Sequence, residues 1–223
     1  MFHLKHNGLT NITGKALMYN KHNPMVRDYA FKSPANMERV LAFVSSSIRE
    51  RTDRLPKYMT EYRQVGAKSS WIWGNKHNTI AYIKKHRKML YTNMVRIIKA
   101  KKKDMALDLI MLFLEIPGFG LPKAGFCVQL VAGKAGCLDV HNIRKYLPDE
   151  DARKGTPSWL QTSGNSIETK RKKAIVYLDL CQKIGGARFL WNEWCNHIAS
   201  EPWAKYAFPT GNDVSEVHTC IWK

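Results

Sequence analysis

The chain has 223 residues, enough for one sizeable domain, and 44% hydrophobic with 24% charged residues is an ordinary globular composition that argues against disorder and fibrous structure. Its charge is unusual, because 36 Lys and Arg against 18 Asp and Glu leave a formal net charge of +18. Since so large an excess of one sign repels itself, it favours a polyanionic partner.

The sequence shows little sign of a membrane span, a signal peptide, disulfide bonds or a zinc site. The longest apolar stretch, residues 106–116, contains Asp108 and Glu115 and is shorter than the roughly 18–20 residues that cross a bilayer, so no membrane span is expected. Residues 1–6 lack the apolar core of a signal peptide, which predicts an intracellular protein. The five cysteines form no C-x-x-C pair, so neither disulfides nor a zinc site is expected.

Taken in chain order, residues 1–32 are rich in Asn, Gly and Lys without periodicity and are predicted to form a peripheral arm. Residues 33–223 are predicted to form a single helical domain. Ser33-Pro34 is a typical helix start, and a second amphipathic helix is predicted to begin at the cap residue Asn78 and to run to Ile98.

Helical periodicity continues in the second half. Four further helices are predicted, over residues 104–116, 122–133, 166–184 and 187–200. A polar stretch with two glycines, residues 149–166, is predicted to be a surface loop. Because strand-like alternation is scarce throughout, the sequence predicts an all-α fold.

The segment 116–125, with the sequence IPGFGLPKAG, joins two predicted helices through a turn whose glycines are two residues apart. This is the pattern of a helix-hairpin-helix. Gly118 and Gly120 can adopt positive φ and leave the backbone bare, so N–H groups at the start of the second helix can meet a phosphate oxygen. Such a contact fixes the position of DNA without reading its sequence. The alternative is a tight turn that only packs two helices.

The segment 133–142, with the sequence GKAGCLDVHN, follows the second helix. With the turn, it resembles the helix-hairpin-helix (HhH-GPD) superfamily of base-excision DNA glycosylases over residues 104–146, about a fifth of the chain. The resemblance implies a helical domain that binds double-stranded DNA and flips a nucleotide out. It implies Asp139 as the catalytic residue, and it assigns the DNA phosphate contacts to the turn, residues Gly118, Phe119, Gly120, Leu121, Pro122 and Lys123.

An aspartate suits this chemistry. Breaking an N-glycosidic bond builds positive charge on the deoxyribose, which a fixed carboxylate can stabilise, and the same group can orient a water molecule. The alternative is that Asp139 is simply the N-cap of the next helix, the commoner use of such a residue.

The sequence also departs from the family. Pro122 occupies the place of the Schiff-base lysine of the strand-cleaving members, so a monofunctional enzyme is favoured. Lys123 is one step along the helix, a turn of about 100°, and is expected to face the backbone phosphates. The four-cysteine loop of some relatives is missing, so no iron–sulfur cluster and no other cofactor is expected. The sequence does not decide whether a structural cation bridges hairpin and phosphate.

Other residues are candidates for a base pocket, each with a structural alternative: Gln129, His141, Asn142, Trp71 and Trp73. A buried amide often makes an interhelical hydrogen bond, a histidine often lies near a helix start, and tryptophans in small helical proteins are usually core residues. There are two basic stretches, Lys84–Lys88 and Lys99–Lys103, which are predicted to form a surface that lies near the DNA phosphates. DNA binding is therefore expected to depend steeply on salt concentration.

Three functions follow. The first is a DNA glycosylase that hydrolyses the N-glycosidic bond of a damaged or modified base. The second is transfer of an amino acid or amine co-substrate onto phosphorylated 5-hydroxymethyluracil in DNA. It is suggested by a resemblance to a divergent viral branch of the superfamily, the alpha-glutamyl and putrescinyl thymine pyrophosphorylase-like enzymes. Either enzyme is expected in the cytoplasm of a prokaryote or of a virus-infected cell. The third is a non-catalytic DNA-binding protein whose Asp139 is only a cap.

Overall fold

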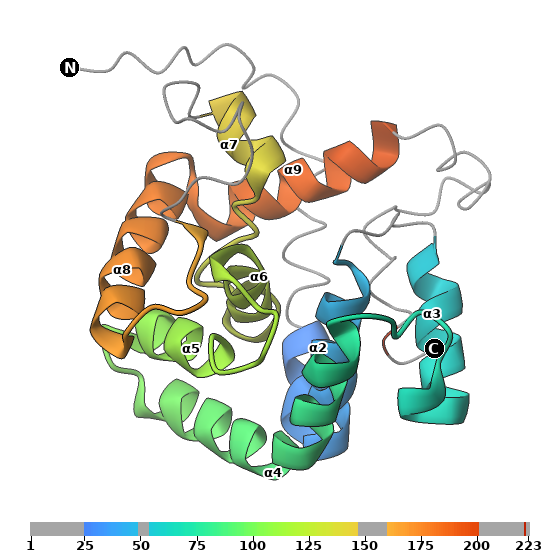
Figure 1. The fold of residues 1–223 in the computed structure, drawn as a ribbon. Helices are drawn as coiled ribbons and strands as arrows, with labels where there is room; N and C mark the ends of the chain where they lie inside the picture. Colours follow the sequence, from blue (N-terminus) through green and yellow to red (C-terminus); the bar gives the residue numbers. More distant parts are fainter. Residues whose placement is uncertain (1–24, 49–53, 147–159, 201–220, 222–223) are drawn as a thin grey trace.

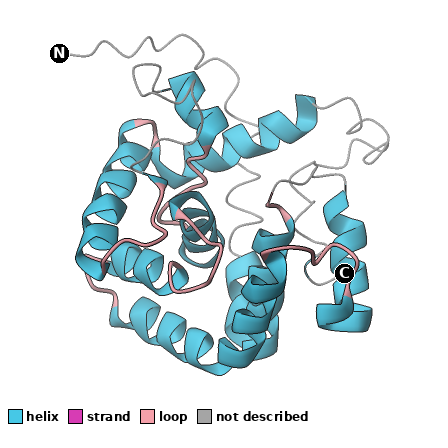
Figure 2. Cartoon of the chain, viewed as in Figure 1, coloured by secondary structure: helices cyan, strands magenta, loops and turns pink. Residues whose placement is uncertain are grey.

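The computed structural model describes residues 25–48, 54–146, 160–200 and 221. Regular structure within these ranges is helical, and no strand occurs among them (Figure 2). The predicted all-α class is therefore confirmed for the part of the chain that is described. None of the helices in these ranges is both long and apolar enough to cross a membrane.

The predicted helices start and end close to their predicted limits, whereas no helix was predicted where α3 and η3 occur. The helices are α2 (Pro34–Ser46), α3 (Leu55–Val65), the 3-10 helix η3 (Gly66–Lys68), α4 (Lys76–Ala100), α5 (Met105–Phe113), α6 (Leu121–Ala132), α7 (Val140–Tyr146), α8 (Ile167–Lys183) and α9 (Gly186–Ser200). Two N-caps explain predicted starts: Ser33 Oγ accepts a hydrogen bond from Asn36 N at 3.1 Å, and Ser166 Oγ accepts one from Thr169 N at 3.2 Å.

Two helices, α2 and α5, each contact three others (Figure 1). Helix α2 packs against α3, α4 and α6, while α5 packs against α4, α6 and α8, and α8 continues into contact with α9. Because α5 is apolar nearly all round, it is enclosed by its neighbours, and Leu109, Ile110 and Phe113 are fully buried. Since α4 packs against α5, it also lies near the turn that joins α5 to α6.

The predicted N-terminal arm differs from the structure in its last part. Residues 25–32 are helical, Val26 and Ala30 are fully buried, and Tyr91 Oη donates a hydrogen bond to Phe31 O at 2.7 Å. Apolar burial therefore joins this segment to the helical body. Residues 1–24 lie outside the described residues.

Two further limits differ. Helix α4 begins at Lys76 rather than at Asn78, because Lys76 N already donates to Trp73 O at 3.1 Å and starts the helical turn earlier. In the predicted loop, Leu160 and Thr162 are buried, so the end of this loop packs into the molecule rather than lying on its surface. Residues 147–159 lie outside the described residues.

A candidate nucleic-acid interface at the α5–α6 turn

Gly118 has the backbone conformation that the hairpin pattern predicts. Its φ is +83°, a value that residues with a side chain rarely adopt, and the residue is exposed. A Cβ built on Gly118 would lie 2.8 Å from Thr79 Oγ1. Both the backbone and the neighbouring threonine therefore favour glycine at this position.

Gly120 differs from the expectation of positive φ. It has φ −94° and ψ −176°, an extended conformation open to any residue, and it is the N-cap residue of α6. A built Cβ would meet only Leu160 O at 3.7 Å and Pro122 Cδ at 3.8 Å, which are ordinary contacts. The fold itself therefore does not require glycine at position 120.

The turn carries backbone donors that are available to a ligand. Phe119 N donates to Ile116 O at 3.0 Å, and Ala124 N donates to Gly120 O at 3.0 Å. Among the described residues, the N–H groups of Gly118 and Gly120 have no acceptor. These donors lie at the N-terminus of α6, where the helix dipole favours an anion.

The side chains of the turn contribute less than the sequence suggested. Phe119 and Leu121 are buried in the core, so only their backbone is within reach of a ligand. Pro122 is partly buried at the first turn of α6. Lys123 directs its Nζ to Ser47 Oγ, 2.9 Å away at the end of α2, instead of into open solvent.

Helix α4 flanks the turn. Thr79 Oγ1 donates a hydrogen bond to Pro117 O at 2.6 Å, which ties the first turns of α4 to the hairpin. Further along α4, burial and the nearby Glu115 carboxylate both raise the pKa of Tyr82. The N-terminal half of α4 therefore runs beside the residues that lead into the turn.

This helix belongs to a long stretch without negative charge. Residues 62–103 contain twelve Lys and Arg residues and no Asp or Glu. Ten of the twelve are exposed: Lys68, Lys84, Lys85, Arg87, Lys88, Arg96, Lys99, Lys101, Lys102 and Lys103. The sequence had pointed to two basic runs, and the structure places both on one helix and its C-terminal end, with the N-terminal half of that helix beside the turn.

A buried hydroxyl fixes the segment that precedes Asp139. Tyr177 in α8 is fully buried, and its Oη donates to Gly136 O and accepts a hydrogen bond from Leu138 N at 2.9 Å. Gly125 of α6 lies against the same place, since a Cβ there would be 2.6 Å from Gly136 O. The segment is thus clamped between α6 and α8.

Asp139 is the N-cap of α7. Its Oδ1 accepts a hydrogen bond from Asn142 N at 3.0 Å, and its carbonyl oxygen accepts one from Ile143 N at 2.9 Å. The side chain is partly buried, and its second oxygen, Oδ2, has no partner among the described residues. The capping role is therefore shown, and a catalytic role would use the other oxygen.

The carboxylate and the hairpin helix act on one buried thiol. Burial, and after it the charge of Asp139, raises the pKa of Cys137 to about 12, while the Lys123 ammonium acts in the opposite direction. Lys123 lies in the first turn of α6. Both charges therefore act on the Cys137 thiol, one from α6 and the other from the N-cap of α7.

The predicted base-pocket residues have different surroundings. Gln129 is fully buried and donates from Nε2 to Ala187 O at 2.7 Å, and Trp71 is 2% exposed and donates from Nε1 to Tyr58 O at 3.0 Å. Both side chains have the structural role that was the alternative. Asn142 donates from Nδ2 to Cys137 O at 2.8 Å beside Asp139.

Trp73 and His141 complete this set. Trp73 is 52% exposed, and Lys76 Nζ lies 5.0 Å from its ring centroid. The side chain of His141 lies outside the part that the structure describes.

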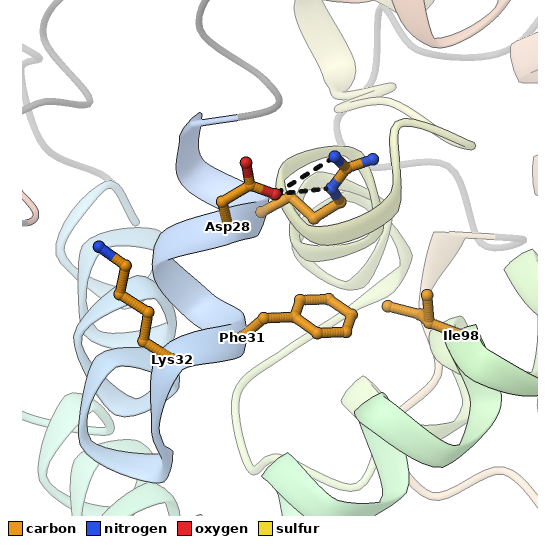
Figure 3. A pocket seen from close by; sticks show the side chains of 5 residues that line it. Asp28, Phe31, Lys32 and Ile98 are labelled. Atoms are coloured by element: carbon orange, nitrogen blue, oxygen red, sulfur yellow. Dashed lines mark hydrogen bonds and ion pairs between the residues drawn. The ribbon is translucent and has the colours of Figure 1, made fainter.

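A cavity of about 410 Å³ lies elsewhere (Figure 3). The helical segment 25–32 and α4 line it with Arg27, Asp28, Phe31, Lys32 and Ile98. None of these residues is among the predicted base-pocket residues, so this cavity is not the predicted base pocket. Among the described residues, no group of three or more His, Cys, Asp or Glu could hold a metal ion.

Comparison with known proteins gives no match to a protein-family model, to a curated protein or to a solved structure.

Proposed function

We propose that this chain binds double-stranded DNA through the α5–α6 turn and hydrolyses the N-glycosidic bond of one flipped nucleotide, with Asp139 as the catalytic residue. The observation that supports this most is the packing of the segment before Asp139 against α6, where a Cβ at Gly125 would lie 2.6 Å from Gly136 O. The free backbone donors of the turn and the cationic α4 supply a binding surface for phosphates.

In the proposed reaction, a phosphate oxygen accepts hydrogen bonds from the turn, and the adjacent nucleotide leaves the base stack. The C1′–N bond breaks with its electron pair going to the base, and positive charge develops on the sugar. Asp139 Oδ2 stabilises this charge while Oδ1 stays bonded to Asn142 N, which keeps the carboxylate in one orientation. Water forms the new C1′–O bond, and its proton is taken up by the departing base or by solvent.

A second candidate is a non-catalytic DNA-binding protein. It is favoured by the hydrogen bond from Asn142 N to Asp139, because helix capping alone accounts for an aspartate at this position. In this case the turn and α4 would bind DNA in the same way, and the carboxylate would contribute only to stability.

Asp139→Asn separates the two candidates. Asparagine is also a good N-cap, so the variant should keep the melting temperature and DNA affinity of the wild type while losing turnover. Labelled duplexes carrying damaged or modified bases are incubated with each protein and then heated in alkali. Strand breaks made by the wild type but not by the variant support hydrolysis. A heavier nucleoside found by mass spectrometry would support group transfer, and unchanged DNA that is nevertheless bound supports the non-catalytic candidate.

Gly120→Ala tests the binding surface separately. Because the fold has room for a Cβ at this position, stability should change little, whereas a phosphate held by the turn would be pushed away. We expect affinity to fall by a similar factor for duplexes of different sequence. Ile175→Ala is the control, since Ile175 is 44% exposed on α8 and lies away from the turn in sequence. Equal affinity of Gly120→Ala and wild-type protein would contradict the assignment of the turn.

A further inference from the structure

We propose that Trp73 stacks on an unpaired base of the DNA held at the turn, so that the preferred ligand class is DNA with an extrahelical or unpaired nucleotide. This inference rests on the proposed DNA binding but not on catalysis by Asp139. It concerns a residue outside the 104–146 core that carries the family resemblance.

The loop that carries Trp73 is anchored on both sides. Before it, Ser70 Oγ donates to Glu61 Oε2 at 2.8 Å, and Trp71 is held in the core by its hydrogen bond to Tyr58 O. After it, the hydrogen bond from Lys76 N to Trp73 O at 3.1 Å opens α4. The backbone at Trp73 is therefore fixed, although its indole is 52% exposed.

A buried cation braces the indole itself. Lys76 is only 5% exposed, and its Nζ lies 5.0 Å from the Trp73 ring centroid and 5.8 Å from the Trp71 ring. Cation–π attraction at this range holds the exposed ring against the ordered one. Because the ring is ordered before a ligand arrives, a stacking partner costs less side-chain entropy to bind.

Trp73 also lies close to the hairpin. Lys76 and Thr79 are three residues apart on α4, which corresponds to about 4.5 Å along the helix axis and to the same side of the helix. Lys76 contacts Trp73, and Thr79 bonds to Pro117 O in the turn. A strand whose phosphate is held by the turn would therefore have its neighbouring nucleotides near the indole.

The surroundings of Trp73 favour a nucleic acid over an apolar protein surface. The exposed residues around it in sequence are polar, small or basic: Lys68, Gly74, Asn75, His77 and Asn78. A protein partner would need a wider apolar patch. An exposed aromatic ring on a basic segment is the combination that binds a base and its phosphates, as in single-strand-binding grooves.

Fluorescence anisotropy with two labelled DNAs tests the inference. One is a fully paired duplex of about 20 base pairs, and the other is the same duplex with one bulged nucleotide. Base–aromatic stacking predicts that Trp73→Ala weakens binding of the bulged DNA by about 5- to 100-fold and of the paired DNA by less than about 2-fold. Trp73→Phe should keep most of the affinity. Ile175→Ala, at a residue 44% exposed on α8, should change neither value and is the matched control.

The possible failures are distinguishable. If Trp73→Ala weakens both DNAs equally, or weakens neither, the stacking role is overturned while DNA binding by the turn stands. If the wild type binds neither DNA at low salt, the proposed function itself fails. Self-association of the wild type that Trp73→Ala abolishes, with DNA affinity unchanged, would assign the indole to a protein contact and would also overturn the inference.

Discussion

Removing the Tyr177 hydroxyl should destabilise the protein, because this group makes two hydrogen bonds to the segment before Asp139. The side chain is fully buried in α8, and its oxygen donates to Gly136 O and accepts from Leu138 N at 2.9 Å. Tyr177→Phe keeps the ring and removes only that oxygen. Leu138 N also donates to Gly136 O at 3.0 Å, so these two backbone groups keep that bond to each other but both lose the buried hydroxyl.

The size of the effect follows from these two groups. Each hydrogen bond contributes about 0.5–1.5 kcal/mol net, so losing two should lower the free energy of unfolding by about 1–3 kcal/mol. For a chain of this length, each kcal/mol lowers the melting temperature by about 2–4 °C, which gives a fall of roughly 2–12 °C. Tyr91→Phe is the matched control, since its partly buried hydroxyl has one acceptor, Phe31 O at 2.7 Å, and should cost about 0.5–1.5 kcal/mol.

Urea unfolding followed by circular dichroism measures both variants. If Tyr177→Phe lost no more stability than Tyr91→Phe, the clamp on the segment 136–138 would be refuted. A further expectation concerns function, because a loosened segment should also displace Asp139. Tyr177→Phe should therefore lower turnover of the proposed substrate more than it lowers DNA affinity.

Three other predictions follow. Burial raises the pKa of Cys137 and of Cys181 to about 12, so alkylation mapped by mass spectrometry at about pH 8 should leave both unmodified until urea unfolds the chain. The unfolded chain loses these thiol protons above about pH 9, while the folded chain keeps them. The free energy of unfolding should therefore fall as pH rises from 9, by up to about 1.4 kcal/mol per pH unit for each thiol. Cys181→Ser should reduce this slope, measured by urea unfolding. Gly118→Ala should destabilise more than Gly164→Ala in thermal unfolding, since both have positive φ but only the first places a Cβ 2.8 Å from Thr79 Oγ1; equal losses would deny that contact a role.

Local signals explain which parts of the fold the sequence could predict. Ser33 and Ser166 cap the helices that they were expected to cap, and Gly133 ends α6 with φ +64°. Each of these features depends on hydrogen bonds within a few residues, so the sequence around it contains the whole cause. The positive φ of Gly118 belongs to the same group.

Contacts between distant segments could not be predicted in this way. Trp71 and Trp73 are two residues apart and look equivalent in sequence, yet one is buried beneath Tyr58 and Tyr62 and the other is exposed. Lys123 was expected to reach a phosphate, but Ser47, 76 residues earlier in the chain, accepts its hydrogen bond. Neither outcome has a local cause, because contacts with α3 bury Trp71 and packing of α2 against α6 brings Ser47 to Lys123.

The hydrogen bond between Lys123 and Ser47 reduces the positive charge that the turn can offer to DNA. Lys123 is the only basic residue from 114 to 124, and its charge is held at Ser47, so the turn itself supplies hydrogen-bond donors but little free positive charge. The attraction must then come from α4, whose 25 residues span about 37 Å, close to one turn of B-DNA. Replacing Lys85 and Lys88 together by Gln should therefore weaken binding to all duplexes and reduce the slope of log affinity against log salt by about 1–2. Lys123→Gln should leave that slope unchanged, and a larger change for Lys123→Gln than for the double variant would show that the turn, not α4, neutralises the phosphates.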